Sequence, residues 1–341
     1  MIKKKHLIIF PRLDIPFKRT IQPVPKEKGP VPPIRTHWVN FLNRLIEYHK
    51  SIKEPLSVLE APLYYVDDVR IEQVEGWSEV FKSVYVPHRN DFEVPLFKFA
   101  KNIEVKYYMQ MVYPWLFQVD KKGWGPTSST YPIIHSPKTP INNKFIDLLR
   151  HRQQEGVSKF DQPSKAEWNE KNYVLFVCQI PHDMSIKYHG NGISVLDALK
   201  YTEEWCRQKN KKLIIKGHPV NPSSMAAMKG MFPEDRYTWK DKMNINDLLK
   251  NAAVVVTVGS GVGMEALLYN KEVVIFGQAD YEKVTHRCNR SNYDQVLDMA
   301  WDYSQQGREE YNKNRAEGFL SEYYKNMIDT TDIESYKCGL I

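Results

Sequence analysis

The stretch from Val254 to Gly277 constrains the fold of this chain more than any other. It runs from apolar β-branched residues through the turn Gly259–Gly263, into a short helical run and then a second β-branched run. This order is typical of a strand, a tight turn, a helix and the next parallel strand. Glycines let a backbone pass close to a ligand, and free N–H groups at a helix start favour an anion. The stretch therefore indicates either a phosphate site at a strand end or a helix for which Ser260 is only the N-cap.

The rest of the second half alternates strand-like and helix-like segments joined by short loops. Such an order implies a parallel sheet of the Rossmann type. The expected strands before the opening stretch are Tyr173–Cys178 and Lys212–Ile215, the expected helices are Ile193–Gln208, Pro222–Met231 and Asn244–Asn251, and the remainder after Tyr281 is expected to be mostly helical.

The first half also mixes strands and helices. Apolar residues at helical spacing predict a helix around Trp38–Ile46, and Ile141–Arg152 has the pattern of another. A polar segment without periodicity, Gln153–Asn172, is the predicted domain linker, and 341 residues favour two domains. We therefore predict an α/β chain with domains at residues 1–165 and 166–325 and a tail at 326–341. The expected strands are Leu7–Phe10, Leu56–Val66, Ser83–Pro87, Val105–Met111 and Leu116–Val119.

Charge and composition narrow the functional classes. The net charge is +7, but the lysines and arginines are spread along the chain and no RNA-binding signature occurs, so no nucleic-acid partner is expected. An acidic substrate or peripheral membrane contact fits this charge better. No apolar run reaches the ~18 residues of a transmembrane helix. The apolar start before Pro11 is too short for a signal peptide, and the four cysteines form no disulfide or metal pattern. We expect a cytoplasmic protein, acting there or at the inner face of the plasma membrane.

Three segments of the second half follow predicted strands and carry polar side chains: Gln179–Ile186, Lys216–Pro219 and Ser260–Glu265. The carboxyl ends of parallel strands share one edge of a sheet, so we expect these loops to face one cleft. Such a cleft suits transfer from a nucleotide-activated donor. His218 and helix N–H groups can neutralise a departing phosphate, and Asp183 can act as nucleophile or base.

Each of these side chains also has a purely structural interpretation. Asp183 is suited to capping the turn before the next helix, and His218 to being a satisfied loop histidine before Pro219. Glu265 either supports the preceding loop by hydrogen bonding or contacts a ribose or base. In the first half, the glycine-flanked Trp124 either stacks on a sugar ring or plugs the domain surface.

Three motifs occur in order between Tyr173 and Tyr281 and together carry a resemblance. They are Gln179-x-x-x-Asp183-x-Ser185-Ile186, Lys216-x-His218-Pro219, and Ser260-x-x-x-x-Glu265-Ala266-Leu267 followed by Lys271-x-Val273-x-x-x-Gly277. In this order they resemble the capsule polysaccharide biosynthesis family, and more narrowly the retaining β-Kdo glycosyltransferases of bacterial capsule and O-antigen assembly. The His-Pro motif with a downstream serine is also similar to bacterial sialyltransferases that use CMP-sialic acid. After Gly277 the chain departs from the capsule pattern, because Glu-Lys-Val follows Tyr281 where the capsule enzymes have Gly-Trp-Gly.

The resemblance implies the GT-B architecture, in which two Rossmann-like domains face a cleft. The nucleotide-sugar binds mainly to the C-terminal domain and the acceptor to the N-terminal one. It implies transfer of Kdo (3-deoxy-D-manno-oct-2-ulosonic acid) from CMP-β-Kdo to a glycan with retention, in capsule, O-antigen or lipopolysaccharide synthesis. By the same resemblance, Asp183 attacks the anomeric carbon, His218 and Ser260 hold the CMP phosphate, Glu265 contacts the ribose or base, and Gln179 contacts the sugar. We also expect His218 to take part in catalysis. The further residues expected to bind the donor are Ser185, Lys216, Gly261 and Gly263.

No cofactor and no metal are expected, because N–H groups and His218 can neutralise the leaving group and no Asp-x-Asp pair occurs. The expected partners are the CMP-sugar and a glycan acceptor, which can be lipid-linked. Acceptor contacts are assigned to His88, Arg89, Asp120 and Trp124. Two alternatives stay open. One is an inverting, sialyltransferase-like enzyme with Asp120 or His88 as base; the other is a non-catalytic polysaccharide-binding or export protein on the same fold.

Overall fold

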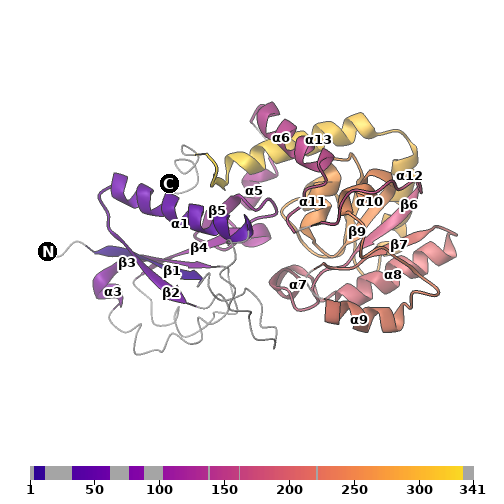
Figure 1. Ribbon diagram of the computed structural model, residues 1–341, viewed down its shortest axis with the longest axis horizontal. Coiled ribbons are helices and arrows are strands. Elements are labelled where there is room, and N and C mark those ends of the chain that lie inside the picture. The colour runs from indigo at the N-terminus through magenta and orange to yellow at the C-terminus, as the bar shows by residue number, and fades with distance from the viewer. Residues whose placement is uncertain are drawn as a thin grey trace. The chain divides into compact units, whose positions relative to one another are not determined.

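The computed structural model describes residues 4–11, 33–61, 77–87, 103–136, 139–160, 162–219 and 222–332. It divides the chain into two compact units, each an α/β structure built on its own sheet (Figure 1). The first unit comprises Met1–Pro132 and Tyr324–Ile341, and the second comprises Ile133–Tyr323. The prediction of two Rossmann-like parts is confirmed.

The sheet of the first unit is mixed, with the order β12-β5-β4-β3-β1-β2. Its first four strands along the chain pair in parallel, whereas β5 runs antiparallel to both β4 and β12. All five strands predicted in the first half are present; the part of the second prediction beyond residue 61 lies outside the described residues. The strands are β1 (Lys5–Pro11), β2 (Leu56–Ala61), β3 (Phe81–Pro87), β4 (Glu104–Gln110), β5 (Leu116–Asp120) and β12 (Ile328–Asp329).

One face of this sheet is covered by α1 (Pro33–Ser51), whose apolar stripe predicted it. Trp38 and Phe41 pack against Tyr108 of β4 and Phe117 of β5; the Phe41 and Phe117 rings stack at 4.4 Å between centroids. The shorter elements of this part of the chain are α3 (Trp77–Val80), the 3-10 turn η2 (Gly125–Thr127) and α5 (Tyr131–Ile134).

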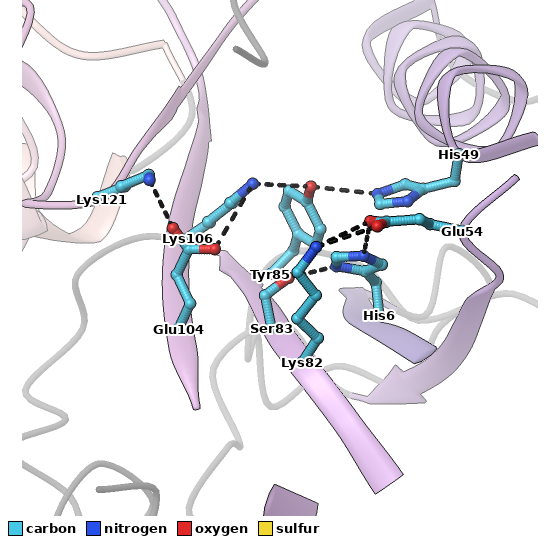
Figure 2. A network of polar contacts seen from close by, with 9 residues as sticks. All are labelled: His6, His49, Glu54, Lys82, Ser83, Tyr85, Glu104, Lys106 and Lys121. Atoms are coloured by element: carbon cyan, nitrogen blue, oxygen red, sulfur yellow. Dashed lines mark hydrogen bonds and ion pairs between the residues drawn. The ribbon is translucent and has the colours of Figure 1, made fainter. Parts of the chain in front are cut away.

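A buried polar network lies beside this core (Figure 2). His6 Nδ1 lies 2.6 Å from the Ser83 hydroxyl, and His6 Nε2 lies 2.6 Å from a carboxylate oxygen of Glu54. The His6 ring lies against His49, with 4.4 Å between centroids, and His49 Nε2 lies 3.1 Å from the Tyr85 hydroxyl. Burial lowers the pKa of His6 and lowers the pKa of His49 to about 4. The imidazoles of His6 and His49 are therefore both neutral in this network.

The sheet of the second unit is parallel throughout, with the order β11-β10-β9-β6-β7-β8. Its central strands β6 and β9 are apolar except for Thr257 at the end of β9, as expected for a sheet covered on both faces. The strands are β6 (Tyr173–Val177), β7 (Leu213–Lys216), β8 (Thr238–Trp239), β9 (Ala252–Thr257), β10 (Glu272–Ile275) and β11 (His286–Arg287).

Helices cover both faces of this second sheet (Figure 1). Helices α8 (Val195–Gln208), α9 (Pro222–Met231) and α12 (Tyr293–Gln305) share one core with alternate strand residues. Helices α10 (Ile245–Asn251) and α11 (Gly261–Leu267) pack on the other face. The remaining elements are α6 (Asn143–Gln154), α7 (Met184–His189), η3 (Glu282–Val284) and α13 (Glu309–Lys325).

The units divide the chain differently from the predicted boundary near residue 165. Helix α6 belongs to the second unit, where Arg150 pairs with Glu317 and the Gln153 side chain donates to the Glu265 carbonyl at 2.9 Å. The expected tail contributes β12 to the first sheet. The boundary between the units and the assignment of the C-terminal tail both depend on contacts between residues that are distant in the sequence. The polarity of a segment does not reveal such contacts. Among the described residues, no helix is long and apolar enough to cross a membrane.

Candidate functional site

The strand order of the second sheet reverses between β6 and β9. The chain builds outward from β6 to β7 and β8, then returns to place β9 on the other side of β6. Open parallel sheets bind ligands outside the carboxyl ends of the strands at such a switch point. The three predicted loops start at this edge, after β6, β7 and β9.

Gln179 ties the loop after β6 to the loop after β9. Its side chain is buried, and its Oε1 accepts hydrogen bonds from the Gly259 N–H at 2.8 Å and the Thr257 hydroxyl at 3.1 Å. Its Nε2 donates to the Ser185 hydroxyl at 3.2 Å. Both ends of the amide are therefore used to fix two loops in one place, and the predicted sugar contact of Gln179 stays a prediction.

Asp183 is the exposed N-cap of α7. Its Oδ1 accepts from the Ser185 backbone N–H at 2.8 Å and from the Ser185 hydroxyl at 2.6 Å. The capping interpretation is thus confirmed. Capping does not prevent Asp183 from also acting as a nucleophile, because the second carboxylate oxygen, Oδ2, has no hydrogen-bond partner among the described residues. The contacts of Oδ1 hold the carboxylate in place.

Ser260 is likewise an N-cap: its hydroxyl accepts from the Val262 N–H at 3.3 Å, at the start of α11, whose first residue is Gly261. The need for glycine at position 263 has a cause that the sequence did not suggest. A Cβ added there would lie 2.7 Å from two ring carbons of Tyr281, whose hydroxyl donates to the Ser260 carbonyl. Gly263 is therefore required for packing against a buried tyrosine, and its predicted donor contact is not needed to explain it.

Glu265 is buried and hydrogen-bonded within the unit. Its carboxylate accepts from the Ser158 hydroxyl at 2.8 and 3.0 Å and from the backbone N–H of Lys159. Burial raises its pKa to about 7, against the opposing effect of these donors. This geometry matches the supporting-loop interpretation; contact with a ribose or base is untested.

The loop after β7 is held by Asp241. Lys216 is buried and its Nζ donates to the Asp241 carbonyl at 2.6 Å, while the Gly217 N–H donates to the Asp241 carboxylate at 2.9 Å. His218 is partly exposed, and the edge of its ring contacts Phe160 at 5.1 Å between centroids. The ammonium of Lys216 is thus committed to the fold, and His218 follows shortly after the end of β7.

Residues 156–160 contribute to the site, although the sequence analysis placed them in the predicted domain linker. The Asn244 side chain clamps it by donating to the carbonyls of Gly156 and Pro163, at 2.9 Å each. Ser158 binds Glu265 and Phe160 contacts His218, so Lys159 lies between them. Burial lowers the pKa of Lys159, against the opposing charges of Asp183 and Glu265. No periodicity marks this segment, because its position depends on residues far away in the chain.

The predicted acceptor residues lie in the first unit. Asp120 is buried, and its carboxylate accepts from the backbone N–H groups of Lys122, Gly123 and Ser129 and from the Ser129 hydroxyl. Trp124 is only 6% exposed, which matches the interpretation of a side chain that plugs the surface. Both observations favour structural roles for these two residues. His88 and Arg89 lie outside the described residues.

Comparison with known proteins shows what this part of the chain is similar to. Residues 134–293 match the family model described as "Capsule polysaccharide biosynthesis protein". A stretch of 123 residues, 33% of the chain, is 28% identical to capsule polysaccharide export protein KpsS of Escherichia coli and covers 32% of it. A stretch of 117 residues, 32% of the chain, is 28% identical to Protein FixF of Sinorhizobium fredii and covers 27% of it. The aligned stretches thus span about a third or less of these relatives.

Two solved structures share the fold over most of the chain. One is Thermosulfurimonas dismutans KpsC, β-Kdo 2,4 transferase, with a TM-score of 0.51 and 18% identity over 76% of this chain and 85% of that one. The other is the β-Kdo 2,7 transferase of the same KpsC, with a TM-score of 0.52 and 16% identity over 87% and 90%. At these identities the likeness establishes the fold. The resemblance to the capsule polysaccharide biosynthesis family is therefore confirmed by the family model over residues 134–293, and the two solved structures show a GT-B fold.

Proposed function

We propose that the protein is a glycosyltransferase that moves Kdo from CMP-β-Kdo to a glycan with retention, in the synthesis of a bacterial capsule or related polysaccharide. The observation that carries this proposal is the Gln179 bridge. It brings the loop of Asp183 and the loop of Ser260 together at the switch point of a parallel sheet. The family match and the two β-Kdo transferases that share the fold support the choice of sugar.

In this proposal Asp183 Oδ2 attacks the anomeric carbon of the sugar, and the bond to the CMP oxygen breaks with its electron pair going to the phosphate. His218 and the N–H groups that begin α11 stabilise the charge of the departing CMP. An acceptor hydroxyl then attacks the same carbon, releasing Asp183 and giving up its proton to a base. Two displacements at one carbon restore the starting configuration. The hydrogen bonds of Ser185 to Oδ1 hold the attacking carboxylate in position.

The direct test compares Asp183→Asn with the wild type. Asparagine keeps the helix cap, whereas alanine would also cost about 1 kcal/mol of stability by removing it. Incubation with CMP-Kdo in the absence of acceptor should give a protein with the mass of one added Kdo in the wild type and none in Asp183→Asn. Asp197→Asn, which changes a capping carboxylate at the start of α8, should form the adduct normally. An adduct on Asp183→Asn, or an inverted product from the wild type, would overturn the assignment.

A nucleotide-binding measurement separates this enzyme from a glycan-binding or export protein on the same fold. CMP should raise the melting temperature of a transferase, because a ligand that binds only the folded state stabilises it. A pure glycan binder should show no shift with CMP. For the inverting alternative, Asp120 is disfavoured as the base, since its carboxylate already accepts hydrogen bonds from several groups of the protein.

A further inference from the structure

Lys159 occupies a fixed position between two elements of the site. Its neighbour Ser158 is bonded to Glu265 of α11, and its other neighbour Phe160 packs on His218 after β7. Its own backbone N–H donates to the Glu265 carboxylate. The main chain on both sides of Lys159 is therefore held, and its partly buried side chain starts from a defined place at the sheet edge.

Two carboxylates lie within electrostatic range of the Lys159 ammonium, and among the described residues neither is bonded to it. Asp183 and Glu265 both act electrostatically on Lys159, yet the described residues give its Nζ no hydrogen bond and no ion pair. A lysine with a purely structural role would gain most by direct pairing, because burying an ammonium without a partner is costly. Three N–H donors are thus available beside the carboxylate that is proposed to attack the sugar.

Two other lysines of the second unit are committed to contacts within the fold. Lys216 donates to the Asp241 carbonyl, and Lys229 pairs with the carboxylates of Asp241 and Glu234 at 2.5 Å each. The donor of the proposed reaction carries two anionic groups, a phosphodiester and the carboxylate of its sugar. The phosphodiester has His218 and the start of α11 as candidate partners, which leaves the carboxylate to be neutralised.

We infer that the Lys159 ammonium binds the carboxylate of the donor sugar and so selects nucleotide-activated sugar acids. This inference rests on the proposed function and extends it to a residue in the predicted linker. The sugar carboxylate is bonded to the anomeric carbon, so the cation that holds it also orients that carbon toward Asp183. A neutral sugar would leave Lys159 between two carboxylates with nothing to bind.

The test measures the affinities of CMP and CMP-Kdo by titration calorimetry, in an Asp183→Asn background that prevents turnover. Lys159→Met should weaken CMP-Kdo binding about 10- to 100-fold, the range for one charged hydrogen bond, and change CMP binding less than about twofold. Lys159→Arg should keep most of the CMP-Kdo affinity. Lys165→Met is the matched control, because Lys165 lies further along the same stretch and its Nζ donates to the Gln154 carbonyl at 2.8 Å; it should bind both ligands normally.

The possible results separate this inference from the function on which it rests. If Lys159→Met binds CMP-Kdo as tightly as its parent, or loses CMP and CMP-Kdo affinity in parallel, the carboxylate assignment is wrong while the proposed function stands. If the parent protein binds neither nucleotide, the proposed function fails and the inference with it. A lowered melting temperature for Lys159→Met but not for Lys159→Arg, with equal affinities, would show a structural charge instead.

Discussion

The Ser158 hydroxyl donates to both carboxylate oxygens of Glu265, at 2.8 and 3.0 Å, across 107 residues of sequence. This contact joins a segment without regular structure to the helix that follows β9. It places Lys159 beside the switch point of the sheet and fixes a buried acid there. Because Glu265 is buried there, the second unit should lose stability as the pH rises.

Glu265→Gln should stabilise the protein above neutral pH. Burial raises the pKa of Glu265 from 4.5 to about 7, so the folded state holds its proton where the unfolded state has lost it. Stability is therefore lost as the pH rises from 4.5 through 7, by up to about 3 kcal/mol. Urea unfolding of Glu265→Gln should show a flatter pH profile than the wild type, and Glu310→Gln, at an exposed position of α13, should not. Lower stability of Glu265→Gln across the whole range would mean that the charged form is the favoured one.

Gly263→Ala should destabilise the fold. The added Cβ would lie 2.7 Å from ring carbons of Tyr281, which is buried and cannot retreat. Overpacking of this kind costs about 1–3 kcal/mol in the free energy of unfolding. Gly318→Ala, in α13, meets no atom within 4 Å and should instead stabilise its helix by about 1 kcal/mol. Equal stabilities for the two variants in chemical denaturation would show that Tyr281 does not constrain Gly263.

His49→Gln should make the first unit less sensitive to acid. Burial lowers the pKa of His49 to about 4, with the nearby His6 acting in the same direction, so the unfolded state takes up the proton first. Stability is present above 6.5 and is lost as the pH falls from 6.5 to about 4, by up to about 3 kcal/mol. The melting temperature of His49→Gln should fall less steeply over that interval. His151→Gln, at an exposed position of α6, should follow the wild type; identical slopes for both variants would contradict the assignment.

Local sequence patterns predicted the elements of the second unit and the edge at which its polar loops lie. Runs such as Val254–Thr257 specify strands locally, and Ser260 and Asn244 specify the helix starts that follow. Since parallel strands share one carboxyl edge, the meeting of the loops after β6, β7 and β9 followed from their order along the chain.

The side chains that complete that edge could be identified only in the folded chain. It moved residues 156–160 from a supposed linker into the site, committed Lys216 to Asp241, and showed that Gly263 accommodates Tyr281. It also buried Trp124 and extended the first sheet with β12. These outcomes depend on contacts between residues tens to hundreds of positions apart. The polarity of a segment does not predict such contacts, because a distant part of the chain can bury a polar residue.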